Sequence, residues 1–121
     1  MECFIHALKN YTNFSGRASR KEFWMFVLFY FLTIIAATFI DVLTGLFSED
    51  AGLGVFSGLL LLFYLVPSIA LYVRRFHDLG HSGWWAILLF VPFVNIAAFI
   101  YVGFFKGTEG PNDYGEAAPA C

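Results

Sequence analysis

Three long apolar runs, separated by short polar segments, constrain this chain more than any other feature. They cover about residues 24–44, 53–73 and 84–105. A helix as long as any of them measures roughly 31 Å, the thickness of a bilayer's hydrocarbon core. Hydrophobic residues make up 60% of the 121-residue chain, more than a small soluble domain can bury. We therefore expect an all-α integral membrane protein with three transmembrane helices, forming one membrane domain over residues 1–121.

The segment before the first run has a helical apolar pattern of its own. Phe4, Ile5, Leu8 and Tyr11 fall on one face of a helix over residues 2–14. This pattern is typical of a short amphipathic helix in the membrane interface, and packing against the chain's own spans is compatible with it too. The tail, residues 106–121, has no apolar period, so we expect it to be irregular.

Local signals predict where the spans begin and end. Ser19 precedes Glu22 by three residues, which is the capping-box spacing and places a helix start one turn before the first apolar run. Gly80 is a helix stop, and Ser82 is a cap for the following helix. The connection between the second and third runs is so short that these two spans must be antiparallel neighbours.

The basic residues predict an orientation. Six of them lie before the first span or between the second and third spans: Lys9, Arg17, Arg20, Lys21, Arg74 and Arg75. Only Lys106 lies on the opposite side if all three segments cross the membrane. Because cytoplasmic loops are enriched in Lys and Arg, we expect a cytoplasmic N-terminus and a C-terminus on the other side. A third segment that enters and returns at residues 92–95 would reverse the second expectation. Trp24, Trp84 and Trp85 fall at the same predicted cytoplasmic interface, as anchors.

Three segments together resemble a known bacterial family. Residues 14–24 (Phe-Ser-Gly-Arg-Ala-Ser-Arg-Lys-Glu-Phe-Trp), residues 74–85 with Arg-Arg-Phe-His-Asp and Ser-Gly-Trp-Trp, and residues 107–115 resemble the motifs of domain-of-unknown-function family 805, the YhaH-like inner membrane proteins. The resemblance covers nearly the whole chain. It implies a multi-pass protein of the bacterial inner (cytoplasmic) membrane and supplies no activity.

The polar residues of the cytoplasmic side form the candidate site for lipid or partner binding: Arg17, Arg20, Lys21, Arg74, Arg75, His77 and Asp78. Basic side chains near a membrane surface attract anionic headgroups. Two other interpretations stay open. The charges could serve only to orient the chain, or they could form a salt-bridged network with Glu22 and Asp78.

Catalytic and metal interpretations of the same region are weaker. His77 and His81 are four residues apart beside Asp78, but Gly80 is expected to end the helix between them, and no third ligand is near. The residues Gly80-His81-Ser82-Gly83 match the letters of an intramembrane serine protease motif, yet the third span offers no base. We expect no enzyme activity, no metal and no cofactor. The net charge of −2 gives no basic field for nucleic acid.

Gly54 and Gly58 have the GxxxG spacing that permits close helix packing, and Asn95 is a candidate for helix–helix hydrogen bonding. Asp41 is expected near water at the outer end of the first span. The leading hypothesis is a non-enzymatic accessory protein at the cytoplasmic interface that binds lipid, supports a membrane partner or serves stress adaptation. The alternative is a subunit of an oligomeric transporter or channel, and an interfacial enzyme ranks last.

Overall fold

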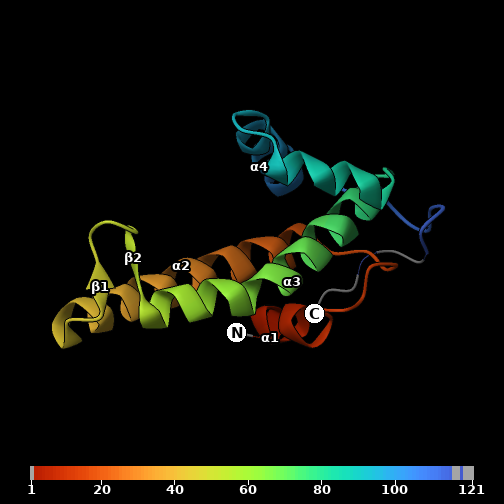
Figure 1. Ribbon diagram of the computed structural model, residues 1–121. Helices are drawn as coiled ribbons and strands as arrows, with labels where there is room; N and C mark the ends of the chain where they lie inside the picture. The colour runs from red at the N-terminus through yellow and green to blue at the C-terminus, as the bar shows by residue number, and fades with distance from the viewer. Residues whose placement is uncertain (1, 116–117, 119–121) are drawn as a thin grey trace.

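The computed structural model describes residues 2–115 and 118, and it is built almost entirely of helices (Figure 1). In chain order the elements are α1 (Glu2–Lys9), α2 (Arg20–Thr44), β1 (Phe47–Ser48), β2 (Leu53–Gly54), α3 (Val55–Asp78), the 3-10 helix η1 (Gly83–Phe90) and α4 (Val94–Phe104). The two short strands pair in antiparallel fashion. The expected helical class is confirmed.

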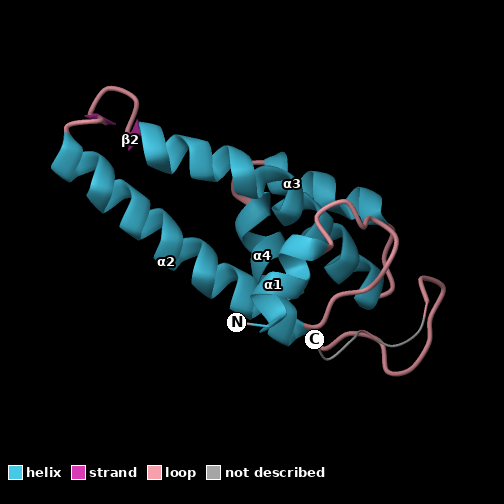
Figure 2. Ribbon diagram, turned by 90° about the horizontal axis from the view of Figure 1, so that it is seen from below, coloured by secondary structure: helices cyan, strands magenta, loops and turns pink. Residues whose placement is uncertain are grey.

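Helices α2 and α3 are both long and apolar enough to cross a membrane. Their 25 and 24 residues correspond to about 38 and 36 Å, slightly more than a hydrocarbon core. They lie side by side and antiparallel, joined by the β1–β2 hairpin (Figures 1 and 2). Many of their large apolar side chains are exposed, such as Ile35 and Leu62. A lipid environment accounts for that exposure.

Side-chain caps fix the ends of these helices. The Ser19 hydroxyl accepts a hydrogen bond from the Glu22 N–H at 3.2 Å, which confirms the predicted start of α2. Gly45, with φ of 75°, ends that helix in the left-handed conformation. At the same end of the molecule, the Asp41 carboxylate accepts hydrogen bonds from the N–H groups of Phe56 and Ser57, both at 2.9 Å. Asp41 is therefore a buried cap for α3 rather than a group in contact with water.

The third apolar run does not form one helix, so the prediction of a transmembrane helix over residues 84–105 is wrong. It consists of η1 and α4, separated by residues 91–93. Pro92 lacks an N–H group, and Phe93 has a φ of 66°, a conformation that a helix cannot contain. Each piece is about 16 Å long, roughly half of a hydrocarbon core.

Together η1 and α4 form a helical hairpin whose two ends both lie beside the C-terminal end of α3. Arg75 Nε donates to the Val102 carbonyl near the end of α4 at 2.8 Å. At the other end, a Cβ atom on Gly83 would lie 3.1 Å from Nε2 of His77. The tail after α4 therefore lies on the side where α2 begins. The residues after α4 and the loop before α2 are therefore neighbours, whereas three full-length antiparallel spans would have separated them.

Helix α1 is shorter than expected, ending at Lys9, and it packs against the long helices (Figure 2). Ala7 is fully buried in this contact. The Phe4 ring lies 5.9 Å from that of Phe26 in α2 and 6.3 Å from that of Tyr64 in α3. Of the two interpretations of residues 2–14, packing against the chain's own spans is the one observed.

Candidate functional site

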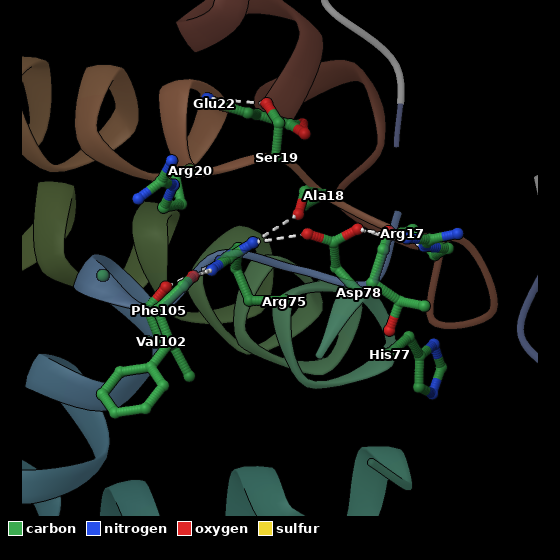
Figure 3. A network of polar contacts seen from close by, with 12 residues as sticks. Arg17, Ala18, Ser19, Arg20, Glu22, Arg75, His77, Asp78, Val102 and Phe105 are labelled. Carbon is green, nitrogen blue, oxygen red and sulfur yellow. Dashed lines mark hydrogen bonds and ion pairs between the residues drawn. The ribbon is translucent and has the colours of Figure 1, made fainter. Parts of the chain in front are cut away.

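Most residues of the predicted site meet in one buried polar cluster where α2 begins and α3 ends (Figure 3). We call it the interfacial network and define it as Arg17, Glu22, Arg74, Arg75, His77 and Asp78. All six side chains belong to residues that are at most 6% exposed. Charged groups in such surroundings have to be paired, because removing them from water is costly. The hypothesis of a salt-bridged network that includes Glu22 and Asp78 is confirmed.

Arg75 is the hub of the interfacial network. Its guanidinium donates to the carbonyls of Val102 (2.8 Å), Phe105 (2.9 Å) and Ala18 (2.9 Å), and it pairs with Asp78 at 2.7 Å (Figure 3). These acceptors belong to α4, the residue after it, the loop before α2 and α3 itself. The fork of five donors lets one arginine bind them together. Arg75 thus fastens the hairpin and the N-terminal loop to the end of α3.

Asp78 extends the network to the tail. Arg17 donates to the Asp78 carboxylate through Nε at 3.0 Å and to the Thr108 carbonyl through Nη2 at 2.5 Å. The Thr108 N–H in turn donates to the Asp78 carbonyl at 2.6 Å. A Cβ atom on Gly107 would lie 1.9 Å from the Asp78 carboxylate, so only glycine fits there. Residues 107–110 are therefore held against α3 and are not a free tail.

A second ion pair lies deeper, between the long helices. Arg74 Nη1 donates to Glu22 Oε1 at 2.8 Å, and Nδ1 of His6 in α1 lies 2.7 Å from the same oxygen. Glu22 thereby binds α1 and α3 instead of completing the capping box with Ser19. Glu22 Oε2 and Arg74 Nε and Nη2 have no hydrogen-bond partner among residues 2–115 and 118.

The histidines have structural partners. His77 Nδ1 lies 2.9 Å from the Gly16 carbonyl, so this nitrogen carries the proton, and the ring stacks on Tyr114 with centroids 4.2 Å apart. His81 Nε2 lies 2.6 Å from the Tyr101 hydroxyl. Ser82 accepts from the Trp84 N–H as an N-cap. Over the described residues, no group of three or more His, Cys, Asp or Glu side chains could hold a metal ion.

Only Arg20 and Lys21 of the seven predicted site residues are exposed. Arg20 donates to the Phe104 carbonyl at 3.2 Å, and Lys21 makes no hydrogen bond with the described part of the chain. Lys106, also exposed, pairs with Glu109, and its hydrogen bond lowers the pKa of that carboxyl group. The basic groups that can reach the surroundings are thus fewer than the sequence suggests.

The three tryptophans behave differently from one another. Trp24 Nε1 donates to the Gly103 carbonyl at 2.6 Å and so attaches α2 to α4. Trp84 is 82% exposed, and Trp85 is 49% exposed with its ring 5.2 Å from that of His81. Trp24 is therefore a packing residue, whereas the exposure of Trp84 suits an interface anchor.

The three residues expected to serve helix packing, Gly54, Gly58 and Asn95, have different surroundings. A Cβ atom on Gly54 would lie 2.2 Å from the Asp41 carboxylate, so this glycine permits close approach of α3 to α2 within the chain. A Cβ atom on Gly58 would meet only the tip of Leu53 at 3.0 Å. Asn95 lies at the start of α4, and its side chain has no hydrogen-bond partner among the residues described.

An apolar groove runs from the interfacial network along α3 and η1. It has a volume of about 620 Å³, with walls that include Ile69, Val73, Ile87 and Phe90. Its other end is lined by His77, Ser82 and Tyr114. The groove therefore combines an apolar body with a polar mouth on the side of the molecule where the tail and the N-terminal loop meet.

Several contributors to the site were not predicted. The carbonyls of Val102 and Phe105 and the side chains of Asn112 and Tyr114 take part, and Asn112 donates to the His77 carbonyl at 2.9 Å. They follow from the return of the hairpin, which no local pattern specifies. The one available signal in the sequence is the segment Pro92–Asn95, where the third apolar run can turn back.

Comparison with known proteins places the chain among bacterial membrane proteins. Residues 11–116 match the family described as protein of unknown function (DUF805). The inner membrane protein YhaI of Escherichia coli K12 is 41% identical over 115 residues, which cover 95% of this chain and 93% of YhaI. The inner membrane protein YhaH of the same strain is 34% identical, with 95% and 94% covered, and the uncharacterized protein YiiR is 26% identical, with 86% and 84% covered. No solved structure matches.

Proposed function

Because the chain belongs to the DUF805 family and is similar to bacterial inner membrane proteins, we propose that it is a two-span inner membrane protein with a re-entrant hairpin. We further propose that it acts as a non-enzymatic accessory that binds phospholipid at the cytoplasmic face. The observation that carries this proposal is the groove with an apolar body and a polar mouth.

The charge distribution supports the orientation. With the hairpin folded back, all seven Lys and Arg residues belong to the side of the chain termini. The connection between α2 and α3 carries Glu49 and Asp50 and no basic residue. This asymmetry is stronger than in a three-span arrangement, and it favours a cytoplasmic location for both the N-terminal loop and the tail.

The polar and apolar parts of the groove lie at the depths where a lipid has its headgroup and its acyl chains, which supports lipid as the occupant. Its mouth is beside the charged ends of α2 and α3, where headgroups lie, and its apolar walls continue toward the bilayer centre. A phospholipid with an acyl chain along Val73 and Ile87 would have its headgroup near Ser82 and Tyr114. The exposed Lys9, Arg20 and Lys21 add positive charge at the same level, which favours an anionic headgroup.

The buried arginines contribute differently from what their sequence positions suggested. Arg17, Arg74 and Arg75 are at most 4% exposed and ion-paired, so they shape the groove mouth by holding the tail and hairpin in place. In this proposal they position the lipid site without contacting the headgroup.

The lipid proposal is tested by native mass spectrometry of protein extracted in mild detergent, with Ile87→Trp as the perturbing variant. Ile87 lines the groove and is 61% exposed, so a tryptophan fills the groove without disturbing a core. Ile35→Trp is the matched control, because Ile35 is 64% exposed on α2. We expect retained anionic phospholipid in the wild type and the control, and its loss in Ile87→Trp. Equal retention in both variants, or none in the wild type, refutes the groove as a lipid site.

The orientation is tested by reporter fusions at each terminus. A fluorescent reporter that folds only in the cytoplasm should be active at both ends, and alkaline phosphatase, which is active only outside, should be inactive at both. Phosphatase activity at the C-terminal fusion alone would contradict the re-entrant hairpin.

A further inference from the structure

A second hollow lies between the pair α2–α3 and the re-entrant hairpin. It consists of two adjoining cavities of about 290 and 340 Å³ that share Phe31, Tyr72, Leu89 and Phe99 as walls. We call it the intramembrane cleft. Its lining residues come from α2, α3, η1 and α4, so the cleft exists only because the third segment returns.

In the two-span arrangement proposed above, the cleft lies deep in the bilayer. Tyr30 is ten residues from the start of α2 and Ser68 ten residues from the end of α3, which places both about 15 Å from the charged ends. Asn95, nine residues from the end of α4, is about 14 Å deep, and Tyr72 about 9 Å. The cleft thus extends from the inner half of the hydrocarbon core toward its centre.

Polar groups without partners line this cleft. The hydroxyls of Tyr30, Ser68 and Tyr72 and the side-chain amide of Asn95 make no hydrogen bond to any residue that the structure describes. An unsatisfied polar group in hydrocarbon is costly, and polar side chains inside a membrane mark functional sites. By contrast, Tyr64, one turn before Ser68 on α3, shares a 2.7 Å hydrogen bond with Thr33.

We propose that the intramembrane cleft binds a neutral, membrane-soluble molecule with a flat ring that carries hydrogen-bonding oxygen atoms, the chemical class of the quinones. The walls are aromatic and include Phe23, Phe26, Phe31 and Phe99, which present ring faces and edges to a planar guest. The Tyr72 hydroxyl and the Asn95 amide can donate to ring carbonyls. No charged side chain lines the cleft, so the guest is uncharged.

Other occupants fit these features less well. A lipid acyl chain would fill the volume but leave the polar groups unpaired, and a headgroup belongs about 15 Å away at the interface. A helix of a second copy, about 10–12 Å across with its side chains, needs more room than cavities of about 290 and 340 Å³ provide. A small ring with polar oxygen atoms satisfies both the aromatic walls and the polar groups.

The test uses the fluorescence of Trp24, whose ring lies 5.5 Å from that of Phe99 in the cleft wall. In a background with Trp84→Phe and Trp85→Phe, the full chain in lipid nanodiscs is titrated with menadione, a small quinone that quenches tryptophan. The matched probe is 2-methylnaphthalene, which has the same ring system without the oxygen atoms. Two variants, Tyr72→Phe and Asn95→Leu, remove polar groups with little change in size, and Tyr11→Phe on the exposed N-terminal segment is the control.

We expect saturable quenching by menadione, about fivefold weaker binding in Tyr72→Phe and in Asn95→Leu, and no change in Tyr11→Phe. Methylnaphthalene should compete only weakly. Quenching that rises linearly with the quinone content of the membrane overturns the proposal, as does an affinity for menadione in the two cleft variants equal to that of the wild type. Equal competition by methylnaphthalene also overturns it, since the oxygen atoms would then not be recognised. Unchanged circular dichroism spectra exclude loss of fold as the cause of weaker binding.

Discussion

Replacement of Arg75 by methionine should detach the hairpin from the rest of the protein. Methionine matches the length and apolar stem of arginine but donates no hydrogen bond. The substitution removes the bonds to the carbonyls of Ala18, Val102 and Phe105 and one of the two arginine partners of Asp78. Every other contact of α3 is left in place.

The magnitude follows from what remains unpaired. A buried carbonyl that loses its donor costs about 1–3 kcal/mol, and this applies fully to Val102, which is completely buried. The Phe105 carbonyl is partly accessible and regains water. Asp78 keeps Arg17, so its charge is not left alone. We therefore expect the free energy of unfolding to fall by about 3–5 kcal/mol, as when one partner of a buried pair is removed.

The assay is reversible unfolding in mixed micelles with an increasing fraction of sodium dodecyl sulfate, followed by circular dichroism. Hydrogen exchange identifies where the loss occurs: amides of residues 94–105 should exchange faster, while those in the middle of α2 keep their protection. Arg75→Lys should lie between the wild type and Arg75→Met, because lysine keeps the charge but not the fork of donors. The control is Arg20→Met, at an exposed arginine with one 3.2 Å bond.

A stability of Arg75→Met within about 0.5 kcal/mol of the Arg20→Met control would refute this reasoning, since that is the range of ordinary surface substitutions. Uniform acceleration of exchange over the whole chain would also refute it. The hub role assigned to Arg75 requires that the hairpin respond first.

Two further substitutions test packing at opposite ends of the molecule. Gly54→Ala should lower the free energy of unfolding by roughly 1–3 kcal/mol, because its Cβ would lie 2.2 Å from the Asp41 carboxyl group. The control is Gly58→Ala, whose Cβ would meet only the flexible tip of Leu53. Equal melting temperatures for the two variants would contradict this prediction. Trp24→Phe should lower the free energy of unfolding by about 1–3 kcal/mol, because it leaves the Gly103 carbonyl without its donor. The control, Trp84→Phe at an 82% exposed position, should change the unfolding curve little. A larger loss of stability in Trp84→Phe than in Trp24→Phe would show that α4 does not depend on Trp24.

The amino-acid sequence predicted the membrane class and the two long helices because these depend on local properties. The apolar runs of α2 and α3 are long enough to cross a bilayer whatever they pack against, and the Ser19 cap is a three-residue signal. The concentration of charge at one end was also visible. Whether these charged residues are buried or exposed could not be predicted, because burial of Arg74 and Arg75 depends on segments distant in sequence.

Only the tertiary structure determined that the third apolar run forms two short helices and which groups the charged residues contact. Composition alone cannot distinguish a single long helix from two half-length pieces with the same apolar content. The positive φ of Phe93 accompanies the return of α4 to Arg75. That return places both ends of the hairpin beside α3, brings the tail to Arg17 and Asp78, and opens the cleft beneath Tyr72 and Asn95. Local sequence determines which segments are apolar enough for lipid, whereas long-range hydrogen bonds determine how those segments are arranged.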